Sequence, residues 1–136
     1  MVTLKCNSMR GVSTGEDVFQ WLSLGWMRHI VRLDIGVWTD VAPGDVLRVR
    51  SEGQSDPIVL VIHEVERAEK LDELVDASNY ISVYPHATSV GVARRYTVNY
   101  LHNNRVGTEG IGYVIMKVAP PTKLEEQIHA DILSPT

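Results

Sequence analysis

An alternating segment directly after a glycine limits most strongly how this chain can fold. Every second residue from Arg28 to Leu33 shares a face of a predicted strand, which places Arg28, Ile30 and Arg32 together. The opposite face carries His29, Val31 and Leu33. A guanidinium keeps its charge at any ordinary pH, so a partly enclosed arginine needs an anionic or hydrogen-bonding partner. The strand is therefore expected to border either a bound ligand or an ion pair.

The composition indicates one folded domain without cross-links. The chain has 136 residues, 44% of them hydrophobic, and its single cysteine is Cys6, so no internal disulfide or multi-cysteine zinc site is expected. The net charge of -4 argues against a general nucleic-acid coat protein but allows a local basic groove. No apolar run approaches the ~20 residues that span a bilayer, and residues 1–20 lack a signal-peptide core. We expect an intracellular protein, cytoplasmic or otherwise, with no membrane partner.

Capping and turn signals divide the chain into short elements. Ser13 and Thr14 stand at capping-box spacing before Glu16 and Asp17, and Gly25 stands at a helix stop, so residues 15–24 are predicted as a helix. Strands are predicted over residues 2–6, 28–33, 46–49, 58–65 and 110–118. Further helices are predicted over residues 70–76 and from Thr88 or Ser89 to about His102, the latter with Tyr96 and Tyr100 on its buried side.

A proline pair, Pro120-Pro121, separates a tail from this domain. Leu124, Ile128 and Ile132 recur every four residues beyond it, which predicts a short helix over about 123–132. The expected organisation is one domain over residues 1–119 and a tail over 120–136. The tail helix is expected to dock on its own domain or on a partner.

The order of elements predicts the fold class. Strand, helix, three strands, two helices and a final strand indicate an α+β fold rather than a wound parallel sheet. So few strands need closure or capping to protect their edges, which favours a small β-barrel.

Several of these residues resemble the ASCH domain, a member of the PUA-like β-barrel superfamily. That family opens with a short helix ending in glycine, then Gly-x-Lys-x-x-Glu-x-Arg on a strand, then a Gly-Asp turn. Gly25, Arg32 and Gly44-Asp45 match this pattern, and the likeness continues through Tyr84-Pro85 and the closing strand. The resemblance covers roughly residues 2–118. It implies a PUA-like barrel flanked by two or three short helices.

The departures from the family pattern bear on chemistry. The family's lysine falls on Met27 and its glutamate, or the threonine of the acetylcytidine amidohydrolases, falls on Ile30. The glutamate that those enzymes place before the longer helix is also missing, because no carboxylate stands between Asn79 and Asn104. Methionine and isoleucine cannot transfer protons or activate water. The family's hydrolytic reaction is not expected here.

The arginines are the first candidate ligand-binding residues. Arg32, with help from Arg28, is expected at the mouth of a cleft, where a guanidinium suits phosphate or a base edge. The alternative for Arg32 is an ion pair with Asp45 that fixes the strand to the turn, and for Arg28 it is a solvated role. Other arginines, among them Arg94, either extend a basic surface or are balanced by acids such as Asp72.

Aromatic residues and histidines complete the candidate site. Trp38, in a loop, is the best candidate for a ligand-facing aromatic, whereas core packing is slightly favoured for Trp26. Tyr84 and His86 flank the proline of the family's pocket-facing segment and could supply hydrogen bonds. The histidines show no metal-ligand spacing, so neither a metal nor a cofactor is predicted.

These features favour an ASCH-like domain that binds RNA or a nucleotide-like ligand near Arg32, without amidohydrolase activity. A first alternative is a hydrolase of modified nucleosides or RNA that uses His86, Tyr84 or Arg28 in replacement roles. A second is a protein-interaction domain whose contact is the tail helix. The sequence leaves the oligomeric state open.

Overall fold

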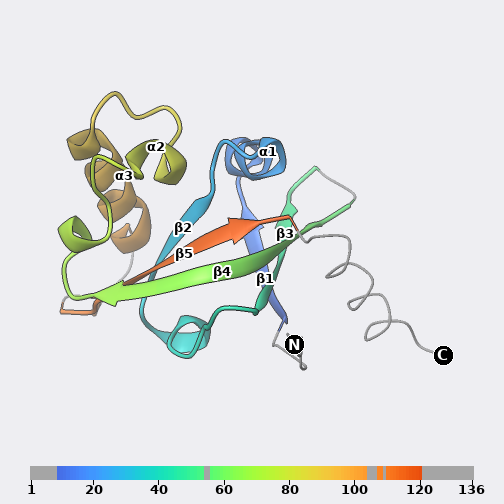
Figure 1. The fold of residues 1–136 in the computed structure, drawn as a ribbon, viewed down its shortest axis with the longest axis horizontal. Helices are drawn as coiled ribbons and strands as arrows, with labels where there is room; N and C mark the ends of the chain where they lie inside the picture. The colour runs from blue at the N-terminus through green and yellow to red at the C-terminus, as the bar shows by residue number, and fades with distance from the viewer. Residues whose placement is uncertain (1–8, 54–55, 104–106, 109, 121–136) are drawn as a thin grey trace.

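The computed structural model describes residues 9–53, 56–103, 107–108 and 110–120 (Figure 1). The predicted strand 2–6 and tail helix 123–132 lie outside these residues. The strands are β1 (Met9–Thr14), β2 (His29–Leu33), β3 (Val46–Ser51), β4 (Ile58–Ala68) and β5 (Tyr113–Ala119). The α-helices are α1 (Glu16–Leu24), α2 (Tyr80–Val83) and α3 (Val90–His102). None of the described helices is long and apolar enough to cross a membrane.

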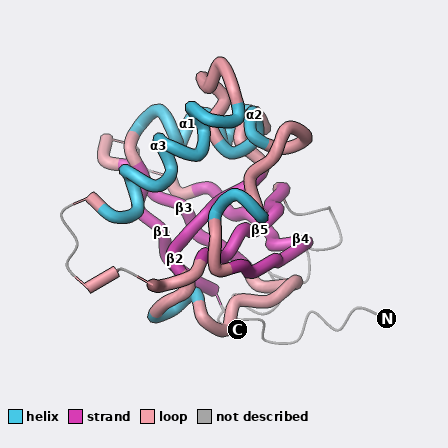
Figure 2. Tube along the Cα trace, turned by 90° about the vertical axis from the view of Figure 1, so that its left-hand side faces the viewer, coloured by secondary structure: helices cyan, strands magenta, loops and turns pink. Residues whose placement is uncertain are grey.

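The strands form one five-stranded sheet in the order β1-β3-β4-β5-β2. β1 runs parallel to β3, and the other neighbours are antiparallel. The sheet curls into a half-barrel, and the three helices gather at one end of it (Figure 2). The predicted α+β class is thus confirmed. β1 and β2 are the two edge strands.

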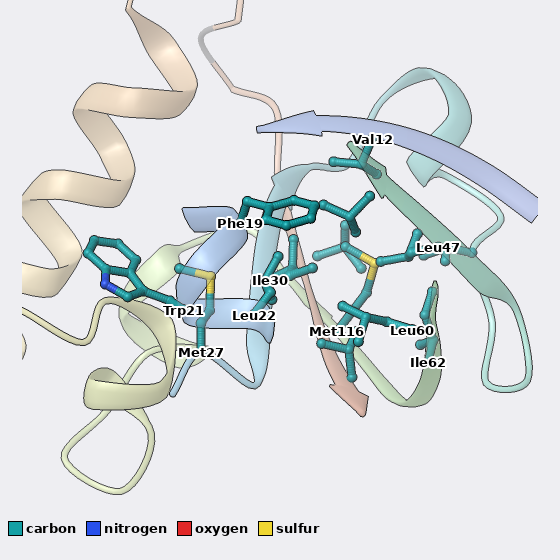
Figure 3. Close-up of a cluster of buried hydrophobic side chains, with 14 residues drawn as sticks. Val12, Phe19, Trp21, Leu22, Met27, Ile30, Leu47, Leu60, Ile62 and Met116 are labelled. Atoms are coloured by element: carbon teal, nitrogen blue, oxygen red, sulfur yellow. The ribbon is translucent and has the colours of Figure 1, made fainter. Parts of the chain in front are cut away.

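α1 packs its apolar side on one face of the sheet. Phe19, Trp21 and Leu22 of this helix are buried against large side chains of the strands, including Leu47 and Met116 (Figure 3). We call this cluster the first core; its other buried members are Val12, Met27, Ile30, Val41, Val49, Leu60, Ile62, Val114 and Val118. Burial of such side chains is the main force that holds the helix on the sheet.

The opposite face of the sheet carries a second core under α2 and α3. Its buried members are Val31, Leu33, Leu71, Leu74, Val75, Val83, Ala93, Leu101, Tyr113 and Ile115. Ile30 faces the first core whereas Val31 and Leu33 face the second, as the alternation predicts. β5 likewise sends Val114 and Met116 to one core and Tyr113 and Ile115 to the other.

The predicted helix 15–24 is confirmed, but its predicted cap is wrong. Gly25 ends α1 in the left-handed conformation, with φ of 77°, a region that glycine enters without a Cβ clash. The N-cap is Gly15, with no side-chain hydrogen bond. Ser13 and Thr14 instead end β1, because pairing of β1 with β3 continues through Thr14↔Ser51. The capping-box spacing was therefore misleading.

The region between β4 and α3 also differs from the prediction. Leu71, Leu74 and Val75 are buried as expected, but Leu71–Glu73 is a 3₁₀ turn rather than part of a helix over 70–76. The side chain of Asn79 accepts from the Asp76 backbone N–H and donates to the Leu74 carbonyl. These side-chain bonds replace helical ones, and the chain then forms the short helix α2.

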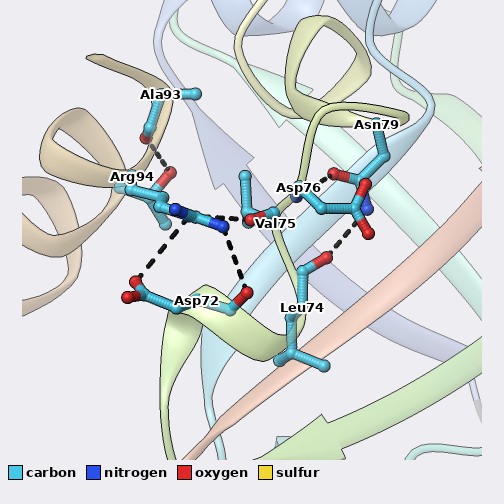
Figure 4. A network of polar contacts seen from close by, with 8 residues as sticks. Asp72, Leu74, Val75, Asp76, Asn79, Ala93 and Arg94 are labelled. Carbon is cyan, nitrogen blue, oxygen red and sulfur yellow. Dashed lines mark hydrogen bonds and ion pairs between the residues drawn. The ribbon is translucent and has the colours of Figure 1, made fainter. Parts of the chain in front are cut away.

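α3 confirms the predicted longer helix and is anchored at both ends. Ser89 is its N-cap, and its hydroxyl accepts from the Val92 N–H at 3.2 Å. Arg94 donates to the carbonyls of Val75 and Asp72 at 2.8 and 3.2 Å and pairs with the Asp72 carboxylate (Figure 4). At the other end, His102 is hydrogen-bonded to Thr108 and to Tyr113 of β5. Arg94 is therefore balanced by Asp72, the second of the two roles considered for it.

Candidate functional site

A cleft lies where α1, the edge strand β2 and α3 meet. Its enclosed part holds about 40 Å³ and is mostly apolar. The lining residues are Thr14, Val18, Leu22, Met27, His29, Ile30, Val31, Arg32, Val83, Tyr96, Thr97 and Tyr100. The cleft therefore combines an apolar floor with a cation and two tyrosines.

The open edge of β2 explains the position of Arg32. The Val118 N–H donates to the Arg28 carbonyl, and the Asp34 N–H donates to the Gly112 carbonyl. The backbone groups of even-numbered residues in this segment therefore point toward β5 and the residues that flank it. Backbone groups of alternate residues point away from that partner, which directs the Val31 carbonyl to the open edge. Arg32 Nη1 donates to this carbonyl at 2.8 Å. The strand edge thus holds the guanidinium at the cleft.

Aromatic rings flank the Arg32 guanidinium. Its Cζ lies 5.9 Å from the ring centroid of Trp38 and 5.9 Å from that of Tyr100, within cation–π range. Trp38 belongs to a 3₁₀ turn, Gly36–Trp38, in the predicted loop after β2. Arg67 of β4 fixes this loop, because its Nη2 donates to the carbonyls of Trp38, Thr39 and Val41.

A row of tyrosines continues from Arg32 along the groove between α1 and α3. Tyr84 and Tyr96 stack with ring centroids 3.9 Å apart, and Tyr96 and Tyr100 are 6.2 Å apart. The pKa of Tyr96 is raised, first by burial and then by Tyr84, Tyr100 and Asp17, while Arg32 opposes the shift. Charges of both signs therefore act on this one ring.

The outer part of the same groove is aromatic and acidic. It has an open volume of about 460 Å³, within the range of small-molecule sites (about 300–1,000 Å³). Trp21 meets Tyr84 edge-on at 5.7 Å and His86 at 4.8 Å. Glu16 and Asp17, in the first turn of α1, line this part of the groove together with the rings.

Two buried polar atoms in the cleft-lining residues have no hydrogen-bond partner within the described chain. They are Thr14 Oγ1 and His29 Nδ1. Burial, followed by the charge of Lys117, lowers the pKa of His29 below its ordinary value. Its imidazole is consequently neutral at neutral pH. Unsatisfied buried groups are uncommon in native proteins, so a polar ligand atom or water is the expected partner of Thr14 Oγ1. The His29 ring lies among Lys117, Glu64 and Glu66, with which it lines a second hollow.

Met27 and Ile30 form part of the apolar floor. Both are buried, with 8% and 4% of their surface exposed, and both line the cleft. The two positions at which the ASCH resemblance places acid–base residues thus face the same cavity as Arg32. Their side chains offer contact area there but no proton.

The structure places three of the seven residues proposed from the sequence in the groove, and a fourth beside it. Arg32 lines the cleft, and Tyr84 and His86 line the outer groove. Trp38 packs against the first core next to the Arg32 guanidinium and lines neither part.

The other three lie elsewhere. Arg28 is exposed, and its Nε donates to the carbonyl of Gly25, the C-cap of α1, at 3.0 Å. Trp26 is 56% exposed, so the core packing favoured for it is wrong. Asp45 is buried in the turn before β3, where its carboxylate accepts from the Ala42 N–H at 3.0 Å. These residues do not line the two parts of the groove.

Sequence reasoning missed several residues that shape the site. The sequence pattern places Tyr96 and Tyr100 on the buried side of α3, yet Tyr100 is 48% exposed and both line the groove. Their i, i+4 spacing was a usable signal, because it places two rings on one helix face. Arg67 gave no such signal, since its partners are carbonyls about 26–29 residues away.

Metal binding finds no support in the described part of the chain. No group of three or more histidine, cysteine, aspartate or glutamate side chains there is placed to hold an ion.

The comparisons with known proteins concern the fold. No family matches the sequence, and no curated protein does. The structure is similar to that of the hypothetical protein PH0355, with a TM-score of 0.66 and 14% identity over 83% of this chain and 99% of that one. It is also similar to the solution structure of protein PF0455 from Pyrococcus furiosus, with a TM-score of 0.60 and 15% identity over 82% and 96% of the two chains. The half-barrel fold is shared. At this level of identity the likeness carries no activity from one protein to another.

Proposed function

We propose that this chain is an ASCH-like binding protein that holds RNA or a nucleotide-like ligand in the cleft beside Arg32. The observation that carries the proposal is the Arg32 guanidinium at the cleft, flanked by the rings of Trp38 and Tyr100 at 5.9 Å each. Arginine recognises phosphate through a planar fork of donors, and aromatic rings stack on bases. Both chemistries that a nucleotide needs are thus side by side.

A polar atom of the cleft fits a ligand with hydrogen-bonding edges. Thr14 Oγ1 is buried at a residue that lines the cleft, and it can donate or accept. A base or ribose offers donors and acceptors that could satisfy this hydroxyl, whereas a purely apolar ligand would leave it unpaired.

Binding is favoured over catalysis because of what stands at Met27 and Ile30. In the ASCH resemblance these positions carry the acid–base residues of the hydrolytic members. Here both side chains are apolar, buried and in the cleft. A ligand would therefore meet packing surface where those enzymes present reactive groups.

A hydrolase of modified nucleosides is the second candidate. The observation that favours it is that Tyr84 and His86, two of the replacement residues considered from the sequence, line the outer groove, since a histidine is a common general base. The third, Arg28, does not line it. Release of acetate from N4-acetylcytidine that disappears in His86→Gln would favour this candidate.

The binding proposal is tested with single-stranded RNA and nucleoside monophosphates. Arg32→Ala should weaken binding about tenfold or more, the effect of losing a charge-assisted contact. Arg48→Ala is the matched control, because Arg48 is exposed on β3 and outside the groove. Equal affinities of wild type and Arg32→Ala, or no binding by wild type, would overturn the proposal.

A further inference from the structure

The outer groove, beyond Arg32, is lined by aromatic rings and carboxylates, which do not bind phosphate. Its walls are the rings of Trp21, Tyr84, His86, Tyr96 and Tyr100. Negative charge enters the same space from Glu16 and Asp17. Aromatic faces attract cations through their quadrupole, so the rings and the carboxylates favour the same sign of ligand charge.

The two carboxylates occupy a position on the helix that favours negative charge. Both stand in the first turn of α1, where the helix dipole stabilises negative side chains. A bound anion would be repelled at this end of the groove, and a neutral ring would remove water from the carboxylates without supplying an opposite charge.

The groove therefore has a negative end and a positive end. Tyr96 and Tyr100 line both its outer part and the enclosed cleft, and Arg32 lies beside Tyr100. The opposing effects of Asp17 and Arg32 on the pKa of Tyr96 agree with this placement. A ligand that satisfies both ends carries an anionic group and a cationic group joined by a short, flat body.

We infer that the groove selects nucleotides whose base carries a positive charge from N-alkylation. The phosphate lies toward Arg32, and the cationic base lies among the rings that line the outer groove, with Glu16 and Asp17 beside it. The inference rests on the proposed function and adds the class of base to it. Alkylation at a ring nitrogen gives a flat, weakly hydrated cation, which aromatic walls accept more readily than a hydrated ammonium.

Two isomeric nucleotides separate base charge from size and phosphate. 1-Methyladenosine 5′-monophosphate has a cationic base at neutral pH, whereas N6-methyladenosine 5′-monophosphate has a neutral base of the same composition apart from the proton. Calorimetric titration of the full chain should give an affinity about fivefold to tenfold higher for the cationic isomer, as expected for a partly desolvated cation–π contact.

The variants assign the preference to the acidic end. Glu16→Gln combined with Asp17→Asn should reduce the preference to about twofold or less, because uncharged amides do not attract the cation. Glu73→Gln, an exposed acid outside the groove, should keep it. Thermal unfolding of each variant checks that the fold is retained.

The outcomes distinguish this inference from the proposed function. Equal binding of the two isomers, tighter binding of the neutral one, or a preference that persists in the double variant would overturn the inference alone. Failure of wild type to bind either isomer would overturn both.

Discussion

The two faces of the half-barrel are held by different means. The first core packs α1 on the sheet almost entirely through apolar side chains. The second core is apolar as well, but α3 is also held by polar contacts of Arg94 (Figure 4) and of His102 with neighbouring segments. Apolar packing has no preferred direction, whereas hydrogen bonds fix orientation.

The difference matters because the cleft lies between the two helices. α1 supplies Val18 and Leu22, and α3 supplies Tyr96, Thr97 and Tyr100. We expect the first core to determine whether the chain folds, and the polar contacts of α3 to determine where its tyrosines stand.

The largest effect is expected in the first core. Leu47 is fully buried, and Leu47→Ala should lower the free energy of unfolding by about 2–5 kcal/mol, the cost of lost burial and a cavity. Urea unfolding followed by tryptophan fluorescence measures it. Val37→Ala is the control, since Val37 is 60% exposed. Ordinary surface substitutions change the free energy of unfolding by about 0.5 kcal/mol or less. A loss below about 1 kcal/mol in Leu47→Ala would therefore contradict the role given to this core.

Arg94→Ala tests the polar anchoring of α3. It removes two hydrogen bonds to carbonyls and a mostly exposed ion pair with Asp72, so a loss of about 1–3 kcal/mol is expected. Hydrogen exchange should show the loss in α3 more than in α1. Arg95→Ala, an exposed neighbour on the same helix, is the matched control. Uniform loss of protection in both helices would contradict a local anchor.

Ser89→Ala should have a smaller effect on the same helix. It removes the N-cap bond to the Val92 N–H, worth about 1 kcal/mol in comparable helices. Thermal unfolding with Thr88→Ala as control measures it. An unchanged midpoint in Ser89→Ala would show that water replaces the cap.

His29 offers the smallest and most specific test. Burial lowers its folded pKa below the unfolded value of about 6.5. The unfolded state therefore binds more protons as the pH falls below 6.5, and the free energy of unfolding should decline there until the folded pKa is passed. His29→Gln should remove this part of the decline, and His63→Gln, on exposed β4 surface, should keep it. Identical pH profiles for wild type and His29→Gln would contradict the assignment.

Local sequence signals predicted most of the fold. Alternation in residues 28–33 and 110–118 placed side chains on the correct faces, because a strand has a fixed period of two. Gly25 and Ser89 marked helix ends through backbone requirements that act locally. The Ser13–Glu16 spacing failed because the pairing of β1 with β3 is a long-range interaction, which a capping pattern does not sense.

The site was less predictable. Arg32 could be proposed because a charged residue on an apolar strand needs a partner, and Trp38 because an aromatic ring in a loop is open to a ligand. The groove itself depends on how α1 and α3 meet across β2, and this decides that Tyr100 is exposed while Trp21 is buried. Arg67 fixes the Trp38 loop by donating to backbone carbonyls. Because every residue type has a backbone carbonyl, no sequence pattern predicts this contact.

Chemical-shift mapping locates a bound nucleotide residue by residue. Adding adenosine 5′-monophosphate should shift the backbone resonances of Arg32, Tyr96 and Tyr100 most, with resonances of the exposed residues of β3 unchanged. Shifts that centre on β3 or the loop before it, or no shifts at all, would contradict the cleft beside Arg32 as the binding site.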